Sequence, residues 1–128
     1  MDITYVKGDI IRAPDKKSNF KKGSVELLVL HLLSIQDCYG YQLTQLIEEL
    51  SNGKILVQEG SLYPVLYKLS EAEHITEKTV QVGKRKTRVY YHLEPSGFSL
   101  LQELREDYFE VHDGIQSVLS SKEVPSDE

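Results

Sequence analysis

A short helical pattern followed by a basic turn constrains the fold of this 128-residue chain more than any other feature. In the stretch 59–69, apolar side chains recur at helical spacing and should point into a core, namely Leu62, Val65, Leu66 and Leu69. Fifteen residues later, the segment 84–88 holds four cations in five residues. It lies between two stretches whose β-branched and aromatic residues are typical of strands. Together these features predict a helix beside a basic β-hairpin.

The other face of this helix carries two tyrosines four residues apart, Tyr63 and Tyr67, with Pro64 and Lys68 close by. An aromatic, hydroxyl-bearing helix face beside a basic hairpin suits a protein that puts a helix into a DNA groove and lays a loop on the phosphates. The candidate DNA contacts are Tyr41, Gln42, Ser61, Tyr63, Pro64, Tyr67, Lys68, Lys84, Arg85, Lys86 and Arg88. Alternatively, the tyrosines could brace the edge of a core. The cations could simply belong to a solvated turn.

Base reading is harder to assign than phosphate binding. The predicted helix contains no Arg, Asn or Gln, the side chains that most often make paired hydrogen bonds to bases. Reading is therefore expected to depend on apolar contacts, on Gln42 or Gln58 nearby, and on the shape of the DNA.

The net charge of −5 does not exclude a nucleic-acid partner, because the acidic residues are unevenly distributed. Eight acidic residues and two basic ones lie from Glu103 onward, whereas residues 1–102 carry twelve acidic and thirteen basic residues. Local patches decide phosphate binding, and the sum over the chain does not.

Several other classes of protein are disfavoured. The single cysteine, Cys38, allows no internal disulfide, and the four histidines lie far apart, so neither a metal site nor a cofactor is expected. Ser61 has no local His or Asp partner and no phosphate-binding glycine loop is present, so an enzyme is not expected. The longest apolar stretch is too short to span a bilayer and the N-terminus is polar, which predicts a reduced, cytoplasmic setting without a membrane partner. Cys38 as a redox sensor is the less favoured reading of a lone thiol.

Three helices are expected before the hairpin. The first, from Val25 to Ile35 with Ser24 as its cap, is apolar almost all round and should be buried. After a turn over residues 37–41, a second helix to about Leu50 should bury Leu43, Leu46, Ile47 and Leu50. The third helix has Ser61 as a candidate cap, which places Pro64 in its first turn, where a missing amide costs little.

The hairpin is expected over residues 75–82 and 87–93, and a long helix over about 96–121 follows it. This order is that of a winged helix-turn-helix, so the predicted fold class is mainly α with a small β-hairpin and a long C-terminal helix. The predicted regions are an N-terminal arm (1–20), a winged helix-turn-helix domain (21–94), a dimerisation helix (95–121) and an acidic tail (122–128). The basic end of the arm is a candidate DNA contact, although a solvated tail is favoured.

The last helix carries an apolar seam that steps by three and four residues over nearly three heptads. A seam of this length has little of its own domain left to cover, so pairing with a second copy is favoured over packing within the chain. The predicted dimer interface consists of Leu101, Leu104, Tyr108, Val111, Ile115 and Val118.

Several motifs, in order, resemble the PadR family of bacterial transcriptional regulators. They are Lys22-Gly23-Ser24 with Glu26-Leu27-Leu28-Val29-Leu30, Tyr39-Gly40-Tyr41-Gln42-Leu43, the run from Gly60-Ser61-Leu62-Tyr63-Pro64 to Leu69, Val89-Tyr90-Tyr91-His92-Leu93, and Pro95-Ser96-Gly97. The resemblance covers roughly residues 20–121 and is closest to the shorter subfamily, which has a single C-terminal helix.

This resemblance implies a homodimeric DNA-binding protein, commonly a repressor, which a small molecule or another signal releases from its operator. It places the DNA-reading helix at about residues 60–71 and the wing at about 75–93. Some members bind flat aromatic or drug-like compounds at the dimer interface; in this chain, which has no tryptophan, Phe98, Tyr108 or Phe109 would have to supply the aromatic contacts. The resulting hypothesis is a repressor that binds an inverted-repeat operator in double-stranded DNA. The alternative is a winged-helix protein–protein interaction module that does not bind DNA.

Overall fold

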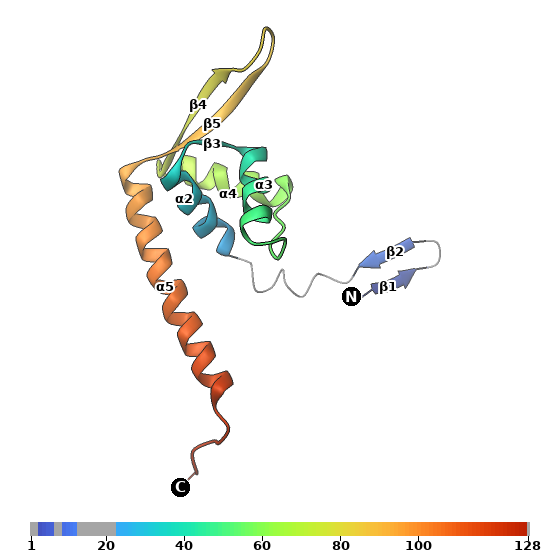
Figure 1. Cartoon of the computed structure of the whole chain (residues 1–128), viewed down its shortest axis with the longest axis vertical. Helices are drawn as coiled ribbons and strands as arrows, with labels where there is room; N and C mark the ends of the chain where they lie inside the picture. The colour runs from blue at the N-terminus through green and yellow to red at the C-terminus, as the bar shows by residue number, and fades with distance from the viewer. Residues whose placement is uncertain (1–2, 7–8, 13–22, 128) are drawn as a thin grey trace.

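The computed structural model describes residues 3–6, 9–12 and 23–127 (Figure 1). Its elements are, in chain order, β1 (Ile3–Val6), β2 (Asp9–Arg12), α2 (Ser24–Ile35), β3 (Cys38–Tyr39), α3 (Gly40–Leu50), α4 (Glu59–Glu71), β4 (Ile75–Gln81), β5 (Thr87–Leu93) and α5 (Pro95–Ser120). Within the described chain, the helices α2, α3 and α4 precede a hairpin and the long helix α5 follows it. This mainly α arrangement with a small sheet confirms the predicted winged helix-turn-helix fold.

The core lies where α2, α3 and α4 meet below the sheet. Its largest fully buried side chains include Leu30 of α2, Leu43 of α3, and Leu62 and Leu66 of α4. Each helix contributes apolar residues spaced three or four apart, so its buried side chains form one stripe that faces the other helices. The inward stripe predicted for α4 is confirmed, with Val65 at its half-buried edge.

The sheet has three strands in the order β3–β5–β4, all antiparallel. The predicted hairpin is present, with a register from Ile75 opposite Leu93 to Gln81 opposite Thr87. The residues expected to form only a turn before α3 include the short strand β3, which pairs with Tyr90 and Tyr91 of β5. This strand fixes the hairpin directly against the start of α3.

Two helices start earlier than the expected caps indicate. Ser24 is the first residue of α2, and Gly23 holds the N-cap position with a left-handed φ of 89°. In α4 the N-cap is Gln58, so Ser61 lies inside the helix rather than at its cap. Pro64 is consequently the sixth helical residue and not part of the first turn. Its missing amide deprives the carbonyl of Gly60 of the usual helical hydrogen bond.

The first two described helices are less buried than their apolar sequences predict. In α2, Val29, Leu30, Leu32 and Leu33 are buried, whereas His31 and Ile35 are exposed. In α3, Leu43 and Ile47 are buried, Leu46 is half-buried and Leu50 is exposed. The outer side of α2 faces the first half of α5, which covers only part of it.

The start of α5 is docked on the turn that follows α4. Gly97 lies against the carbonyl oxygen of His74, so close that a Cβ would overlap that oxygen. The Glu94 amide donates to the same carbonyl at 3.0 Å, and the Ser96 hydroxyl lies 3.0 Å from Nδ1 of His74. Beyond this junction, the second half of α5 extends away from the other helices (Figure 1). The turn that follows α4 therefore helps to set the direction in which α5 leaves the domain.

The N-terminal region contains more regular structure than the predicted arm. Strands β1 and β2 pair in antiparallel fashion, from Ile3 opposite Arg12 to Val6 opposite Asp9. The basic end of the predicted arm, with Lys16 and Lys17, lies outside the described residues, as do Lys21 and Lys22 at the start of the predicted DNA-binding domain.

Candidate nucleic-acid interface

The candidate interface begins where α4 crosses the start of α3. The Tyr63 ring lies against Gly40, and its hydroxyl occupies the space that a Cβ at that position would need. The Tyr63 side chain is nevertheless 44% exposed. The ring therefore braces α3, which is one of the two roles considered from the sequence, while part of it remains exposed.

The remaining predicted side chains of α4 differ in how freely they can reach DNA. Ser61 and Pro64 are exposed, and Tyr67 is 68% exposed. The Lys68 ammonium lies 3.7 Å from the Glu26 carboxylate of α2, so part of its charge is already balanced within the chain. Tyr67 is thus the freest aromatic side chain among these α4 candidates.

The start of α3 supplies one free side chain and one that is already engaged. Tyr41 is exposed. The Oε1 atom of Gln42 accepts a hydrogen bond from the Tyr39 amide at 3.3 Å, at the N-terminal end of the helix. Gln42 therefore acts as a cap for α3, so one acceptor site of this candidate amide is already engaged within the chain.

The wing carries most of the positive charge of the candidate interface. Lys84, Arg85 and Lys86 are all exposed at the turn, which the Val82 amide closes by donating to the Lys86 carbonyl at 2.9 Å. The Arg88 guanidinium instead lies 4.2 Å from the centre of the Tyr39 ring, a cation–π contact that holds it over β3. The structure thus separates three tip cations from one that packs against the sheet.

Inside the sheet, Tyr91 links the wing to the helices. Its side chain is buried, and burial raises the pKa of the phenol, with further contributions from the Glu77 carboxylate and Tyr63. The phenol therefore stays neutral through the physiological pH range.

A groove of about 330 Å³ lies between α3 and the segment that leads into α4. It is lined by Tyr41, Thr44, Gln45, Glu48, Leu56, Val57 and Gln58. Gln45 is a candidate that the sequence reasoning missed. Its spacing of four residues from Tyr41, outside the apolar stripe of α3, was the signal that could have identified it.

The predicted dimer seam divides into a buried and an exposed part. Leu101 is only 2% exposed and belongs to the core of its own chain, so it is not available to a partner, contrary to the prediction. Leu104 is half-buried against the same core. Tyr108, Val111, Ile115 and Val118 are exposed, as are Phe109 and Leu119 beside them.

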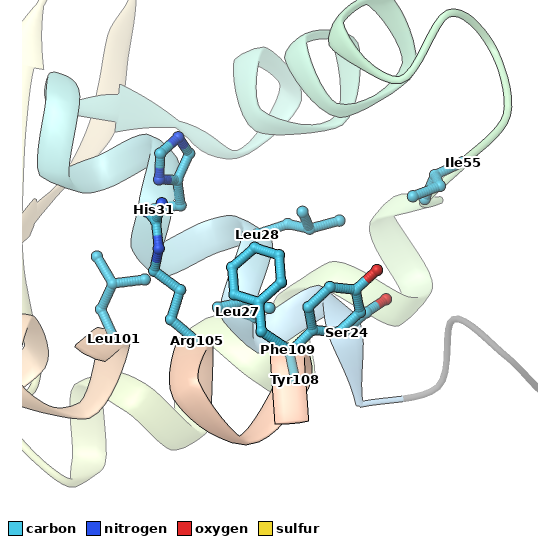
Figure 2. Close-up of a pocket in the computed structure, with 9 residues that line it drawn as sticks. All are labelled: Ser24, Leu27, Leu28, His31, Ile55, Leu101, Arg105, Tyr108 and Phe109. Atoms are coloured by element: carbon cyan, nitrogen blue, oxygen red, sulfur yellow. The ribbon is translucent and has the colours of Figure 1, made fainter. Parts of the chain in front are cut away.

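A second groove, of about 240 Å³, lies between α2 and the part of α5 from Leu101 to Phe109 (Figure 2). Leu27 and Leu28 of α2 and Leu101, Tyr108 and Phe109 of α5 supply its apolar and aromatic walls, while His31 and Arg105 are its ionisable side chains. Phe98, the other aromatic residue considered for ligand contacts, is not among the lining residues. The groove can accept a compact apolar or aromatic group.

Cys38 is enclosed rather than placed for reaction. Its side chain is fully buried, and its Sγ donates to the Gln36 carbonyl at 3.5 Å. Burial raises the pKa of the thiol, which keeps it in its less reactive protonated form. Within residues 3–6, 9–12 and 23–127, no group of three or more His, Cys, Asp or Glu side chains could hold a metal ion. No helix in that part of the chain has the length and apolar character of a membrane span.

Comparisons with known proteins agree with this architecture. Residues 29–106 match the model of the family described as "Transcriptional regulator PadR-like family". Among curated proteins, an uncharacterised protein X from Lysinibacillus sphaericus is 28% identical over 107 residues, which are 84% of this chain and 98% of that protein. The transcriptional regulator YqjI of Escherichia coli strain K12 is 32% identical over 98 residues. That alignment covers 77% of this chain but only 45% of YqjI, so this chain corresponds to less than half of it.

Solved structures give the same picture. A PadR-like transcriptional regulator from Bacillus cereus strain ATCC 14579 superposes with a TM-score of 0.71 at 27% identity, over 82% of this chain and all of that chain. A PadR family transcriptional regulator from Eggerthella lenta DSM 2243 has a TM-score of 0.70 at 25% identity, over 81% of this chain and 88% of that one.

Proposed function

Since the chain belongs to the PadR-like family of transcriptional regulators, we propose that it is a repressor that binds an inverted-repeat operator as a homodimer. In this proposal it acts in the cytoplasm and is released from DNA by a small-molecule effector. Residues 21–94 form the DNA-binding domain, residues 95–121 pair the two protomers, and residues 122–128 are an acidic tail.

The observation that carries the proposal is the fixed connection between the basic wing and the helix-turn-helix. Strand β3 ends at Tyr39, where it pairs with β5, and α3 begins at the next residue. The wing tip, with Lys84, Arg85 and Lys86, is therefore held at a set position relative to the start of α3. Such an arrangement suits a wing that contacts phosphates while α4 lies in the major groove.

Pairing through α5 is supported by the apolar side chains on its second half. Val111, Ile115 and Val118 are exposed at heptad spacing on a part of the helix that extends beyond the domain (Figure 1). Exposed apolar side chains in such a row are typical of a helix that packs against a partner helix. Two copies joined in this way present two α4 helices to DNA, which suits an inverted repeat.

The groove between α2 and α5 is the proposed effector site (Figure 2). Tyr108 belongs both to this groove and to the proposed dimer seam. A small aromatic or drug-like compound in the groove would therefore contact the helix that sets the distance between the two α4 helices. This shared residue is the reason to expect that ligand binding changes DNA affinity.

A gel-shift assay on the DNA upstream of the protein's own gene tests the proposal, with and without candidate aromatic compounds. A retarded complex that competitor DNA of unrelated sequence does not displace supports an operator-binding regulator. If about six to eight phosphates are contacted, the logarithm of the affinity should fall with the logarithm of the salt concentration at a slope of about −5 to −7. A complete absence of retention on promoter DNA would support a protein–protein interaction module instead.

A further inference from the structure

The outer face of α4 does not by itself explain how a sequence could be read. The exposed side chains on the face of α4 that is expected to meet the DNA major groove include Ser61, Tyr63 and Tyr67. Of these, Tyr63 is directed partly against Gly40. Gln42, which the sequence offers together with Gln58 as a candidate for base recognition, already accepts a hydrogen bond as a cap of α3. The other amide near the start of α4, Gln58, is therefore the one to consider for paired hydrogen bonds to a base edge.

Gln58 has the required position. It is the N-cap residue of α4, with extended backbone angles of −86° and 157°, and its side chain is exposed. Its carbonyl accepts hydrogen bonds from the amides of Ser61 and Leu62 at 2.9 and 3.0 Å, so the backbone that carries the side chain is well anchored.

The identity of this residue is not explained by helix capping. Glutamine is not among the preferred N-cap residues. Within the described residues, the Gln58 side chain makes no capping hydrogen bond. Its amide thus retains a donor and an acceptor at the end of the helix that enters the major groove in helix-turn-helix proteins.

The groove between α3 and the segment that leads into α4 is lined by a second amide side chain. Gln45 and Gln58 both line it, on α3 and at the start of α4 respectively. Thr44 is directed elsewhere, because its hydroxyl donates to the Tyr41 carbonyl at 2.7 Å. The amide side chains that line this groove are therefore Gln45 and Gln58.

We propose that Gln58 reads an adenine in each half-site and that Gln45 is a positioning residue that orients its amide. A glutamine amide matches the acceptor N7 and the donor N6 of adenine in the major groove. The proposal rests on the proposed DNA-binding function and adds the residue and the base that would give it specificity. Loss of one such contact should reduce the preference for adenine over the other bases by about 10- to 100-fold per half-site.

The test is selection of binding sites from randomised double-stranded DNA by the full-length chain. Gln58→Ala should make all four bases equally acceptable at one symmetric pair of positions that the wild type fills with adenine. Gln58→Glu should shift the preference there toward cytosine, whose N4 amino group donates to a carboxylate. Gln45→Ala should weaken the same preference without moving it. Gln102 is an exposed glutamine of α5, so Gln102→Ala is the matched control and should leave the selected sequence unchanged.

The outcomes separate this inference from the function on which it rests. Should the wild type select a sequence that Gln58→Ala and Gln58→Glu also select, the protein is an operator-binding regulator but Gln58 does not read it. Should the wild type select no sequence at all, both the proposed function and this inference are wrong. The thermal unfolding temperature of each variant should match that of the wild type, because Gln45 and Gln58 are exposed. Matching values show that altered selection does not come from misfolding.

Discussion

The phenol of Tyr63 lies directly over Gly40, the first residue of α3. This contact sets how closely α4 approaches the start of α3, because any side chain larger than hydrogen at position 40 would meet the ring. The geometry of the helix-turn-helix thus depends on a glycine in one helix and a tyrosine in the other.

Gly40→Ala should destabilise the fold by about 1–3 kcal/mol, since the added methyl group forces the Tyr63 ring to move. Urea unfolding measures the change. The double variant Gly40→Ala with Tyr63→Ala should lose less stability than the sum of the two single variants. Gly60→Ala is the matched control, because, apart from its chain neighbours and the backbone of its own helix, no atom of the described residues lies within 4 Å of its Cβ position. Strict additivity of the two substitutions would refute the contact.

Gly97→Ala should be more damaging than Gly40→Ala. The new methyl group would overlap the backbone carbonyl of His74, which cannot rotate away as a side chain can. We expect a loss of at least about 2 kcal/mol in chemical unfolding, in the range of overpacked or strained sites. Gly114→Ala in the same helix has open space around it in the described protomer and should instead gain up to about 1 kcal/mol. Equal effects at the two positions would contradict the docking of α5.

Replacing Lys84, Arg85 and Lys86 together by Ala should weaken binding to every DNA sequence, since these exposed tip cations are expected to contact phosphates, which every DNA sequence carries. With three cations lost from each protomer of a dimer, the salt dependence of log affinity should flatten by up to about 5 units. Fluorescence anisotropy with operator and unrelated DNA measures both effects. Lys122→Ala, beyond the end of α5, is the control and should change neither; a triple variant with an unaltered salt slope would exclude the wing as the phosphate anchor.

Val111→Asp together with Ile115→Asp should convert the proposed dimer to a monomer with an unchanged fold, because both side chains are exposed in the protomer. Sedimentation velocity measures the mass. Leu104 is a poorer choice, because it also packs against its own core. Ser117→Asp adds charge away from the seam and should leave the dimer intact; a dimeric Val111→Asp, Ile115→Asp variant would refute pairing through this surface.

Stability should fall as the pH rises above about 9. Burial raises the pKa of the folded Cys38 thiol above its ordinary value of 9.0, so the unfolded thiol ionises first and draws the chain toward the unfolded state. The thiol's contribution is complete below the unfolded pKa and is lost as the pH approaches the folded one. Cys38→Ala should lessen this slope in urea unfolding between pH 8 and 10. The same burial predicts slow alkylation of Cys38 in the native protein and rapid alkylation in urea.

Much of the fold could be predicted because the relevant signals are repeated. The hairpin combines alternating strands with a polar turn, and its strand limits differ from those predicted by at most one residue. The limits of α5 are also within one residue of the prediction, because its seam repeats over many turns. The inward stripe of α4 was clear for the same reason, with four apolar residues at helical spacing.

Features that depend on a few residues or on tertiary contacts were not predictable. Strand β3 has two residues, too few for any periodic pattern, and exists only because β5 pairs with it. The start of α4 was misplaced because Ser61 is a better intrinsic cap than Gln58, although Gln58 holds that position. Leu101 fits the apolar seam as well as Val111 does, and only the docking of α5 on α2 decides that it is buried.

The junction at His74 has a geometric consequence for the spacing of the two DNA-binding domains in the proposed dimer. With 26 residues, α5 is about 39 Å long at 1.5 Å per residue. A rotation of about 10° at the Gly97 end would displace the far end by roughly 7 Å, about one fifth of the 34–36 Å that separates successive major grooves on one face of DNA. In the proposed dimer, a small change of angle at one backbone carbonyl would therefore change whether two half-sites can be occupied at once.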